Sequence, residues 1–237
     1  MPLIRLDKFL SDMGIASRKE LKQIIRSGRV TVDGKSTVIP ETKIDADRCT
    51  VAFDGRTLKY SRFHYYMMDK PCGILTATED GKQKTVLDLV TDEMRRMGLF
   101  PVGRLDKDTS GLLLLTDDGE YAHRVISPKS SVEKLYYAKV DGIPDEEDVR
   151  AFAEGIVLID GTHCLPAKLA VNGTDCCYVT VMEGKYHQVR RMLASRGKPV
   201  LELRRLSVGG LKIDSSLGAG GFRELEQWEI ELALQSN

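Results

Sequence analysis

The sequence predicts an α+β protein, in which a small N-terminal module precedes a larger body with a mixed, largely antiparallel sheet flanked by helices. Two segments with helical spacing of apolar residues occupy residues 3–28. Asp-Gly pairs at 33–34 and 54–55 then mark hairpin turns. Beyond residue 64, short strands and helices follow one another without the regular alternation of a parallel fold. The predicted domains are residues 1–59 and 60–237.

The two N-terminal helices have recognisable ends. Apolar side chains recur at helical spacing from Leu3, and Gly14 provides a stop for the first helix. Ser17 has the chemistry of an N-cap, and Glu20 three residues later completes a capping box. The second helix is expected to run to Gly28, with basic side chains along its outer face.

The elements of the body follow from alternation and from turn residues. We expect strands at residues 65–70, 112–115, 133–140, 165–171 and 176–182, and helices at 85–97, 121–126, 145–155 and 184–193.

The composition separates the two regions by charge. Lys+Arg and Asp+Glu both total 35, but residues 1–60 hold 12 basic and 8 acidic side chains. This excess favours electrostatic binding of nucleic acid by the first module, although an ordinary solvated face would have the same count. The 5 cysteines and 4 histidines have neither disulfide nor metal-ligand spacing, so we expect no metal. Without a signal peptide or a long apolar run, the chain is expected to be cytoplasmic.

A polar loop that leads into a buried strand is the strongest candidate for chemistry. The cluster from Gly103 to Gly111 precedes four leucines, which read as a strand buried on both faces. Asp106 lies between Arg104 and Lys107, and nearby cations favour its ionised form. An ionised carboxylate at the rim of a sheet can act as a nucleophile or a base. For an arbitrary Gly-x-x-Asp, the residues alone favour a turn in which Asp106 and Asp108 cap backbone amides.

The same stretch resembles the catalytic signature of pseudouridine synthases of the RsuA/RluB type. It reads Gly-Arg-Leu-Asp-Lys-Asp-Thr-Ser-Gly-Leu over residues 103–112, against a family pattern of Gly-Arg-Leu-Asp-x-Asp/Asn-Thr-Ser/Thr-Gly-Leu. The resemblance implies a pseudouridine synthase fold for the body and a catalytic role for Asp106.

Residues 5–34 resemble the α-L RNA-binding motif of a small-subunit ribosomal protein. The matching parts are Arg-Leu-Asp-Lys-Phe-Leu from Arg5, Ser17-Arg18, and Gly-Arg-Val-Thr-Val-Asp-Gly from Gly28. The resemblance implies that basic side chains here contact phosphates, which position RNA more than they read its sequence. The candidate RNA-binding residues are Arg5, Lys8, Arg18, Lys19, Lys22, Arg26, Arg29 and, in the catalytic loop, Arg104.

Further site residues are implied by the family pattern. Tyr136 would stack on the target base, while its neighbour Tyr137 points to the opposite face of the strand. Arg190 would pair with the catalytic carboxylate, and Leu206 would pack against the base pocket. From the residues alone, Tyr136 could also be a half-buried sheet tyrosine, and Arg190 a phosphate contact on a helix face.

Two residues receive lesser roles. Lys70, in the Asp-Lys-Pro-x-Gly turn, is given no more than an RNA contact, and His187 is expected to orient local structure.

The implied reaction converts a uridine of ribosomal RNA to pseudouridine, after the nucleotide has been flipped out of its helix. It needs no cofactor. Small-subunit (16S) rRNA, free or in an assembly intermediate, is the expected partner of a monomeric enzyme, with 23S rRNA as the alternative. A non-catalytic RNA-binding assembly factor is a second reading. A glycoside hydrolase, which needs two spaced carboxylates, is a third.

Overall fold

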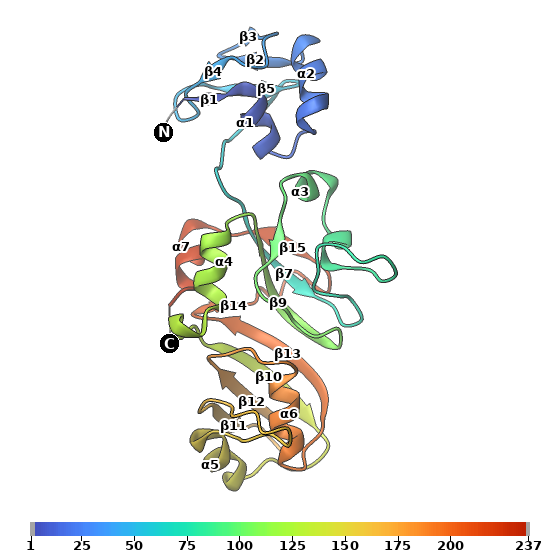
Figure 1. Ribbon diagram of the computed structural model, residues 1–237, viewed down its shortest axis with the longest axis vertical. Coiled ribbons are helices and arrows are strands. Elements are labelled where there is room, and N and C mark those ends of the chain that lie inside the picture. Colours follow the sequence, from blue (N-terminus) through green and yellow to red (C-terminus); the bar gives the residue numbers. More distant parts are fainter. Residues whose placement is uncertain (1–2, 236–237) are drawn as a thin grey trace. The chain divides into compact units, whose positions relative to one another are not determined.

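The computed structural model describes residues 3–235, and the chain divides into two compact units (Figure 1). The first unit comprises the chain up to His64 together with Val90–Leu99, and the second comprises Tyr65–Leu89 and the chain from Phe100 onward. The first unit therefore contains a segment of the region that the sequence analysis assigned to the body. No helix within residues 3–235 is long and apolar enough to cross a lipid bilayer.

The described residues of the first unit form three short helices and six short strands. They are β1 (Ile4–Arg5), α1 (Leu6–Asp12), α2 (Arg18–Arg26), β2 (Val30–Val32), β3 (Lys35–Ser36), β4 (Lys43–Ile44), β5 (Val51–Phe53), β6 (Arg56–Leu58) and α3 (Asp92–Arg96).

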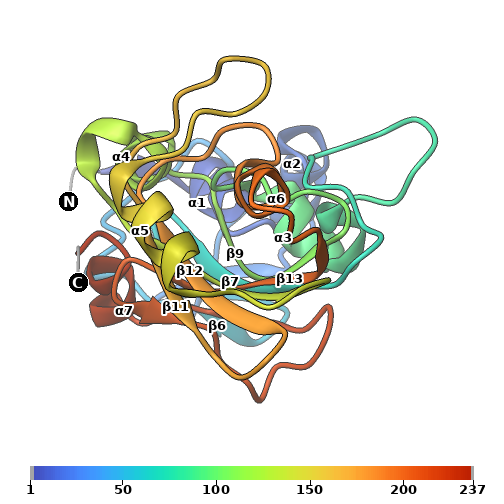
Figure 2. The same cartoon turned by 90° about the horizontal axis from the view of Figure 1, so that it is seen from below.

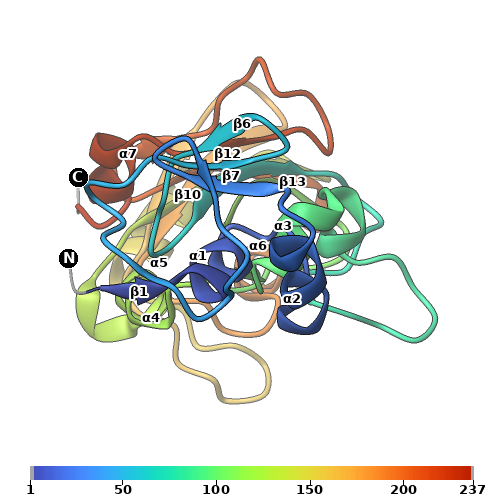
Figure 3. The same cartoon turned by 90° about the horizontal axis from the view of Figure 1, so that it is seen from above.

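Local sequence signals account for most of this unit. The capping box is confirmed, because the Ser17 side chain accepts from the Glu20 amide and the Glu20 side chain accepts from the Ser17 amide. Both hairpins turn at Asp-Gly, where Asp33 and Asp54 have φ values of 50° and 48°. The helices α1 and α2 bury apolar side chains against the four-stranded sheet β3-β2-β5-β6 (Figure 3).

The helix expected over residues 85–97 is wrong as a single element. A 3-10 helix, η1, covers Val86–Leu89. The helix α3 then begins after Thr91, whose hydroxyl caps it by accepting a hydrogen bond from the Met94 amide. This cap divides one apolar pattern between two helices, because a capping residue has non-helical backbone angles. Within the first unit, Gly14 (φ 69°) lies so close to α3 that a Cβ there would be 2.3 Å from the Glu93 carbonyl oxygen.

The second unit is organised by one large sheet. Its strands are β7 (Tyr65–Lys70), β8 (Phe100–Pro101), β9 (Thr109–Thr116), β10 (Lys134–Val140), β11 (Lys168–Val171), β12 (Cys176–Val181), β13 (Val200–Val208), β14 (Leu211–Lys212) and β15 (Phe222–Glu224). Its helices are η1, α4 (Gly119–Ile126), η2 (Pro128–Ser130), α5 (Glu146–Glu154), α6 (Gln188–Ser195) and α7 (Gln227–Leu232).

The predicted mixed, largely antiparallel sheet is confirmed. The strand order is β11-β12-β10-β13-β9-β7-β15, and β13 with β9 is the parallel pair (Figures 1 and 2). The strands β9 and β13 also mark the meeting of two cores. Apolar side chains of α5 and α6 pack on the β10–β12 half, and those of α4 and α7 on the β7–β9 half. Leu112–Leu115 of β9 are at most 2% exposed, so both faces of the strand are buried and the loop before it is anchored to the core.

Candidate active site

The loop that carries Asp106 is held in place by a buried lysine. The ammonium group of Lys70, at the end of β7, donates to the main-chain carbonyls of Pro71, Asp106, Lys107 and Thr109, over 2.9 to 3.3 Å. The Lys70 side chain is fully buried, at 0% exposure. Three of its four acceptors belong to the loop, at Asp106 and at two positions after it, so one cation fixes the loop from Asp106 to Thr109.

The RNA contact expected of Lys70 is therefore wrong, because a fully buried amine cannot reach a phosphate. Burial lowers the pKa of Lys70, while nearby acidic groups, including Asp106, oppose that shift. The carbonyl oxygens replace the water that the ammonium loses, which is the condition for burying a charge.

Two further contacts fix the loop. The Thr76 hydroxyl donates to the Leu105 carbonyl at 2.7 Å and accepts from the Leu105 amide at 3.2 Å. Where the loop joins β9, Gly111 (φ 103°) approaches β13 so closely that a Cβ would be 2.2 Å from the Arg205 carbonyl oxygen. Only glycine fits this crossing, which explains its place in the sequence pattern.

Asp106 is accessible, with its side chain 30% exposed. Its Oδ1 lies 3.5 Å from Nε2 of His187, which stands directly before α6. The expected pairing with Arg190 is not found within residues 3–235. The Arg190 guanidinium instead donates to the carbonyls of Asp108 and Val200, at 2.8 and 3.3 Å. Arg190 thus supports the loop through its backbone, and His187 contacts the carboxylate.

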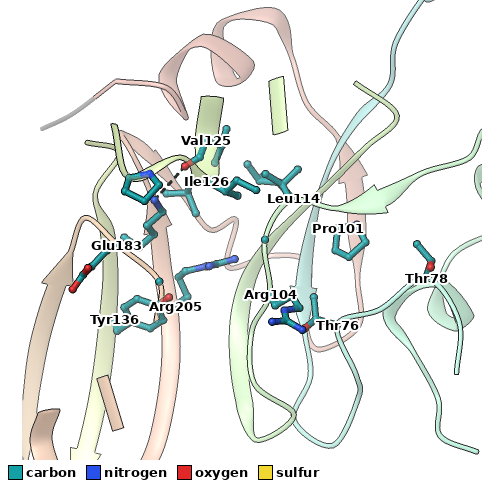
Figure 4. A pocket seen from close by; sticks show the side chains of 16 residues that line it. Thr76, Thr78, Pro101, Arg104, Leu114, Val125, Ile126, Tyr136, Glu183 and Arg205 are labelled. Atoms are coloured by element: carbon teal, nitrogen blue, oxygen red, sulfur yellow. Dashed lines mark hydrogen bonds between the residues drawn. The ribbon is translucent and has the colours of Figure 1, made fainter. Parts of the chain in front are cut away.

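A pocket of about 560 Å³ opens beside this loop (Figure 4). Its wall includes Gly103 and Arg104 from the loop and Gly184 from the segment before His187. Asp106 is not part of the wall. The loop that carries Asp106 and the segment that carries its partner His187 both reach the wall, at Arg104 and at Gly184.

Of the two adjacent tyrosines on β10, Tyr136 lines the pocket. Tyr137 makes its contacts elsewhere, with its hydroxyl 2.9 Å from the Cys176 sulfur and its ring against Tyr178. This is the alternation that the sequence analysis predicted for neighbouring strand residues.

Buried charged side chains line the pocket, namely Arg205, Lys134 and the carboxylate of Glu183. Arg205 is 5% exposed and donates from Nε to the Leu112 carbonyl, and its guanidinium extends into the space between Tyr136 and Arg104 (Figure 4). Lys134 also lines the pocket, donating to the carbonyls of Val125 and Val132. Burial, and then the charge of Arg205, lowers the pKa of Lys134 to about 8.

Leu206, the residue expected at the base pocket, does not line this one. Tyr136 pairs with Arg205 and Leu135 pairs with Ser207, so Leu206 is the extra residue of a β-bulge. The bulge shifts the alternation of β13 by one residue. Arg205 and Val208 consequently line the same pocket although they are three positions apart.

The predicted RNA-binding residues of the first unit fall into two groups. Arg5, Lys8 and Arg29 form ion pairs, mainly with Asp7, Asp12 and Asp54 respectively. The α2 residues Arg18, Lys19, Lys22 and Arg26 are exposed and form no ion pair within the described chain. Among residues 3–235, no group of three or more His, Cys, Asp or Glu side chains is arranged to hold a metal ion.

Comparison with known proteins gives matches over both units. A family model described as RNA pseudouridylate synthase matches residues 64–195. The chain belongs to this family. An S4 domain model matches residues 4–47 of the synthase, which confirms the expected RNA-binding module. The enzyme is thus an isomerase that converts uridine in RNA to pseudouridine.

Full-length relatives support the same assignment. The synthase is 42% identical over 233 residues to the Bacillus subtilis "Uncharacterized RNA pseudouridine synthase YtzG", covering 97% of this chain and 98% of the relative. It is 40% identical over 228 residues to a Vibrio cholerae "Ribosomal small subunit pseudouridine synthase A", covering 96% and 98%. A crystal structure of a pseudouridylate synthase matches with a TM-score of 0.69 and 34% identity, covering 97% of this chain and 99% of that one.

Three groups of this site were not predicted from the sequence. Arg205 and Lys134 had no predicted role, and Lys70 was expected at the surface. One signal was available: Lys70 ends a strand whose preceding residues include Met67 and Met68, and a charge at the end of an apolar strand needs buried partners.

Proposed function

We propose that the synthase isomerises one uridine of small-subunit (16S) ribosomal RNA. The observation that carries this proposal is the match, at 38% identity over 229 residues, to the Escherichia coli "Ribosomal small subunit pseudouridine synthase A", covering 96% of this chain and 98% of that one. The V. cholerae relative has the same name. A ribosomal substrate, free or within an assembly intermediate, implies action in the cytoplasm, and the proposed active form is a monomer.

Asp106 is the proposed catalytic residue. The reaction breaks the bond from ribose C1′ to uracil N1 and forms a bond from C1′ to C5. The C5 proton leaves and N1 gains a proton, so the composition of the nucleotide is unchanged. An accessible carboxylate beside a base-sized pocket supports attack on C1′ or on the uracil ring. In this proposal Lys70, His187 and Arg190 position the carboxylate and its loop.

The pocket is proposed to receive the flipped nucleotide. The uracil ring would stack on Tyr136, and the guanidinium of Arg205 would donate a hydrogen bond to a uracil carbonyl. These contacts would offset the few kcal/mol that unstacking costs. Arg104, exposed at the pocket wall, would fill the vacated place in the RNA or hold a phosphate.

The two predicted domains divide the work in this proposal. Residues 1–59 bind phosphates through the exposed α2 cations, and residues 60–237 carry out the isomerisation. Phosphate contacts bind RNA without reading its sequence, so recognition of one uridine depends mainly on the catalytic body and on the shape of the RNA.

Mapping the product tests the proposal. The full-length enzyme is incubated separately with unmodified 16S rRNA, unmodified 23S rRNA and an unmodified small-subunit particle, and pseudouridines are mapped at nucleotide resolution. We expect one new pseudouridine in small-subunit RNA. Asp106→Asn serves as the blank for each substrate.

Two results would contradict the assignment. If pseudouridine forms only in 23S rRNA, the substrate is large-subunit RNA and the 16S assignment is wrong. RNA binding without product in any substrate would favour the non-catalytic assembly factor.

A further inference from the structure

Tyr186 is an exposed aromatic side chain next to the catalytic loop. It is 75% exposed, compared with 62% for Trp228, another solvent-facing aromatic residue of the second unit. One face of its ring stacks on His187, with ring centroids 4.0 Å apart and planes inclined by 15°. The exposure of Tyr186 leaves its other face open to solvent.

This stack leads directly to Asp106. The imidazole that supports Tyr186 also places its Nε2 3.5 Å from the Asp106 carboxylate. His187 has φ 48° and ψ 34°, a left-handed conformation that is uncommon for residues other than glycine. An uncommon backbone conformation that persists beside a reactive group points to a functional constraint.

The segment around the stack is fixed from several sides. Arg191 donates to the Tyr186 carbonyl at 3.4 Å and forms an ion pair with Asp160 at 2.5 Å. The Gln188 side chain accepts from the Lys185 amide and donates to Glu183. The exposed ring is therefore attached to an ordered backbone, so little conformational entropy would be lost when a ligand stacks on it.

We propose that Tyr186 is a stacking platform for an unpaired base of the substrate RNA that flanks the flipped uridine. An aromatic ring accepts any base, because every base has a π face. Its place next to the carboxylate selects a nucleotide near the target, since only one side chain, His187, separates the open ring from Asp106. The proposal rests on the proposed function, because it names a contact to the same RNA.

The stack also implies a preference in the RNA. A base can reach Tyr186 only if it is unpaired or easily unstacked, as in a loop or bulge. Purines offer a larger stacking surface than pyrimidines. The platform therefore favours targets in irregular RNA with a purine beside the uridine.

Tyr186→Ala and Tyr186→Phe test the proposal under single-turnover conditions with a substrate RNA fragment. Tyr186→Ala is expected to raise the RNA concentration for half-maximal rate by about 5- to 150-fold, the range measured for loss of one stacked base. Its rate at saturation should stay within about 3-fold of the wild-type rate, and Tyr186→Phe should behave like wild type. Trp228→Ala, which removes another exposed aromatic ring, is the matched control and should have no effect.

RNA with one abasic site identifies the stacked nucleotide. Abasic sites are placed in turn at the positions flanking the target uridine. At one position the abasic site should weaken binding to the wild type as much as Tyr186→Ala weakens binding of intact RNA. The same abasic site should not weaken binding to Tyr186→Ala any further. A general structural defect in Tyr186→Ala would not produce this non-additivity.

Unchanged binding by Tyr186→Ala would overturn the inference. So would equal losses for wild type and variant at every abasic position. Either result leaves wild-type turnover intact, whereas failure of the proposed function would appear as wild-type enzyme that makes no pseudouridine in this RNA.

Discussion

The two units use basic side chains in opposite ways. On α2 the cations Lys19, Lys22 and Arg26 are exposed and unpaired within the described chain. In the second unit Lys70 and Arg205 are buried and donate to main-chain carbonyls. The exposed cations can exchange counterions for RNA phosphates at little cost. The buried cations have already replaced their water with protein oxygens, so they shape the Asp106 loop and the pocket.

Lys70→Met should have the largest effect on stability, because it removes the cation that binds four main-chain carbonyls. Of these, the Asp106 and Lys107 carbonyls keep backbone donors, the amides of Thr109 and Gly73. We expect a loss of about 3 kcal/mol in the free energy of unfolding, measured by urea denaturation. The single-turnover rate should fall about 100-fold, since a small displacement of Asp106 would misplace the proposed catalytic carboxylate.

Lys107→Met is the matched control in the same loop. Lys107 is exposed and donates to the Gln83 side chain, so its removal should cost less than about 0.5 kcal/mol. Equal losses in stability for the two variants would show that burial does not distinguish these lysines.

Loss of exposed α2 cations should act on binding instead. The double variant Lys22→Ala/Arg26→Ala should lower the slope of log K against log salt by about 1.4 to 1.8, if each cation contacts one phosphate. Its rate at saturating RNA should be unchanged. Filter binding over a series of salt concentrations measures the slope.

The control for this variant removes the same charge from ion-paired positions. Lys8 and Arg29 already pair with Asp12 and Asp54, so Lys8→Ala/Arg29→Ala should change the salt slope by less than half as much. A larger change in the control would reverse the assignment of the RNA-binding face.

The smallest expected effect is the pH dependence contributed by Lys134. Its pKa is lowered to about 8 in the folded protein, mainly by burial, against about 10.4 in an unfolded chain. Between about pH 8 and pH 10 the unfolded state binds more protons than the folded state. The free energy of unfolding therefore increases as the pH rises. Lys134→Met lacks this contribution. The free energy of unfolding of the wild type, measured by urea denaturation, should therefore rise relative to that of Lys134→Met across this pH range. If the two free energies change with pH in parallel, the pKa of Lys134 is not lowered.

Local signals in the sequence predicted much of the fold. The Ser17 capping box, the Asp-Gly turns and the buried leucine strand each depend on residues within a few positions of one another, and the structure contains all of them. The helix expected at 85–97 was wrong because the apolar spacing continues across Thr91, whose cap interrupts it.

The site depends on contacts between distant residues, which spacing does not reveal. The carbonyl acceptors of Lys70 in the loop lie 36 to 39 positions away in the sequence. The bulge that keeps Leu206 out of the pocket wall depends on how β13 pairs with β10. Arg190 and His187 are three residues apart, and only the course of the chain before α6 decides which of them reaches Asp106.

The most direct test compares two carboxylates of the loop before β9. Asp106 has an accessible side chain next to His187, whereas Asp108 is exposed and supports the loop through its carbonyl. Saturating single-turnover rates and RNA affinities are measured for Asp106→Asn and Asp108→Asn. We predict that Asp106→Asn forms no detectable pseudouridine while its affinity stays within about 2-fold of wild type, and that Asp108→Asn keeps most of the rate. A normal rate for Asp106→Asn would contradict the account.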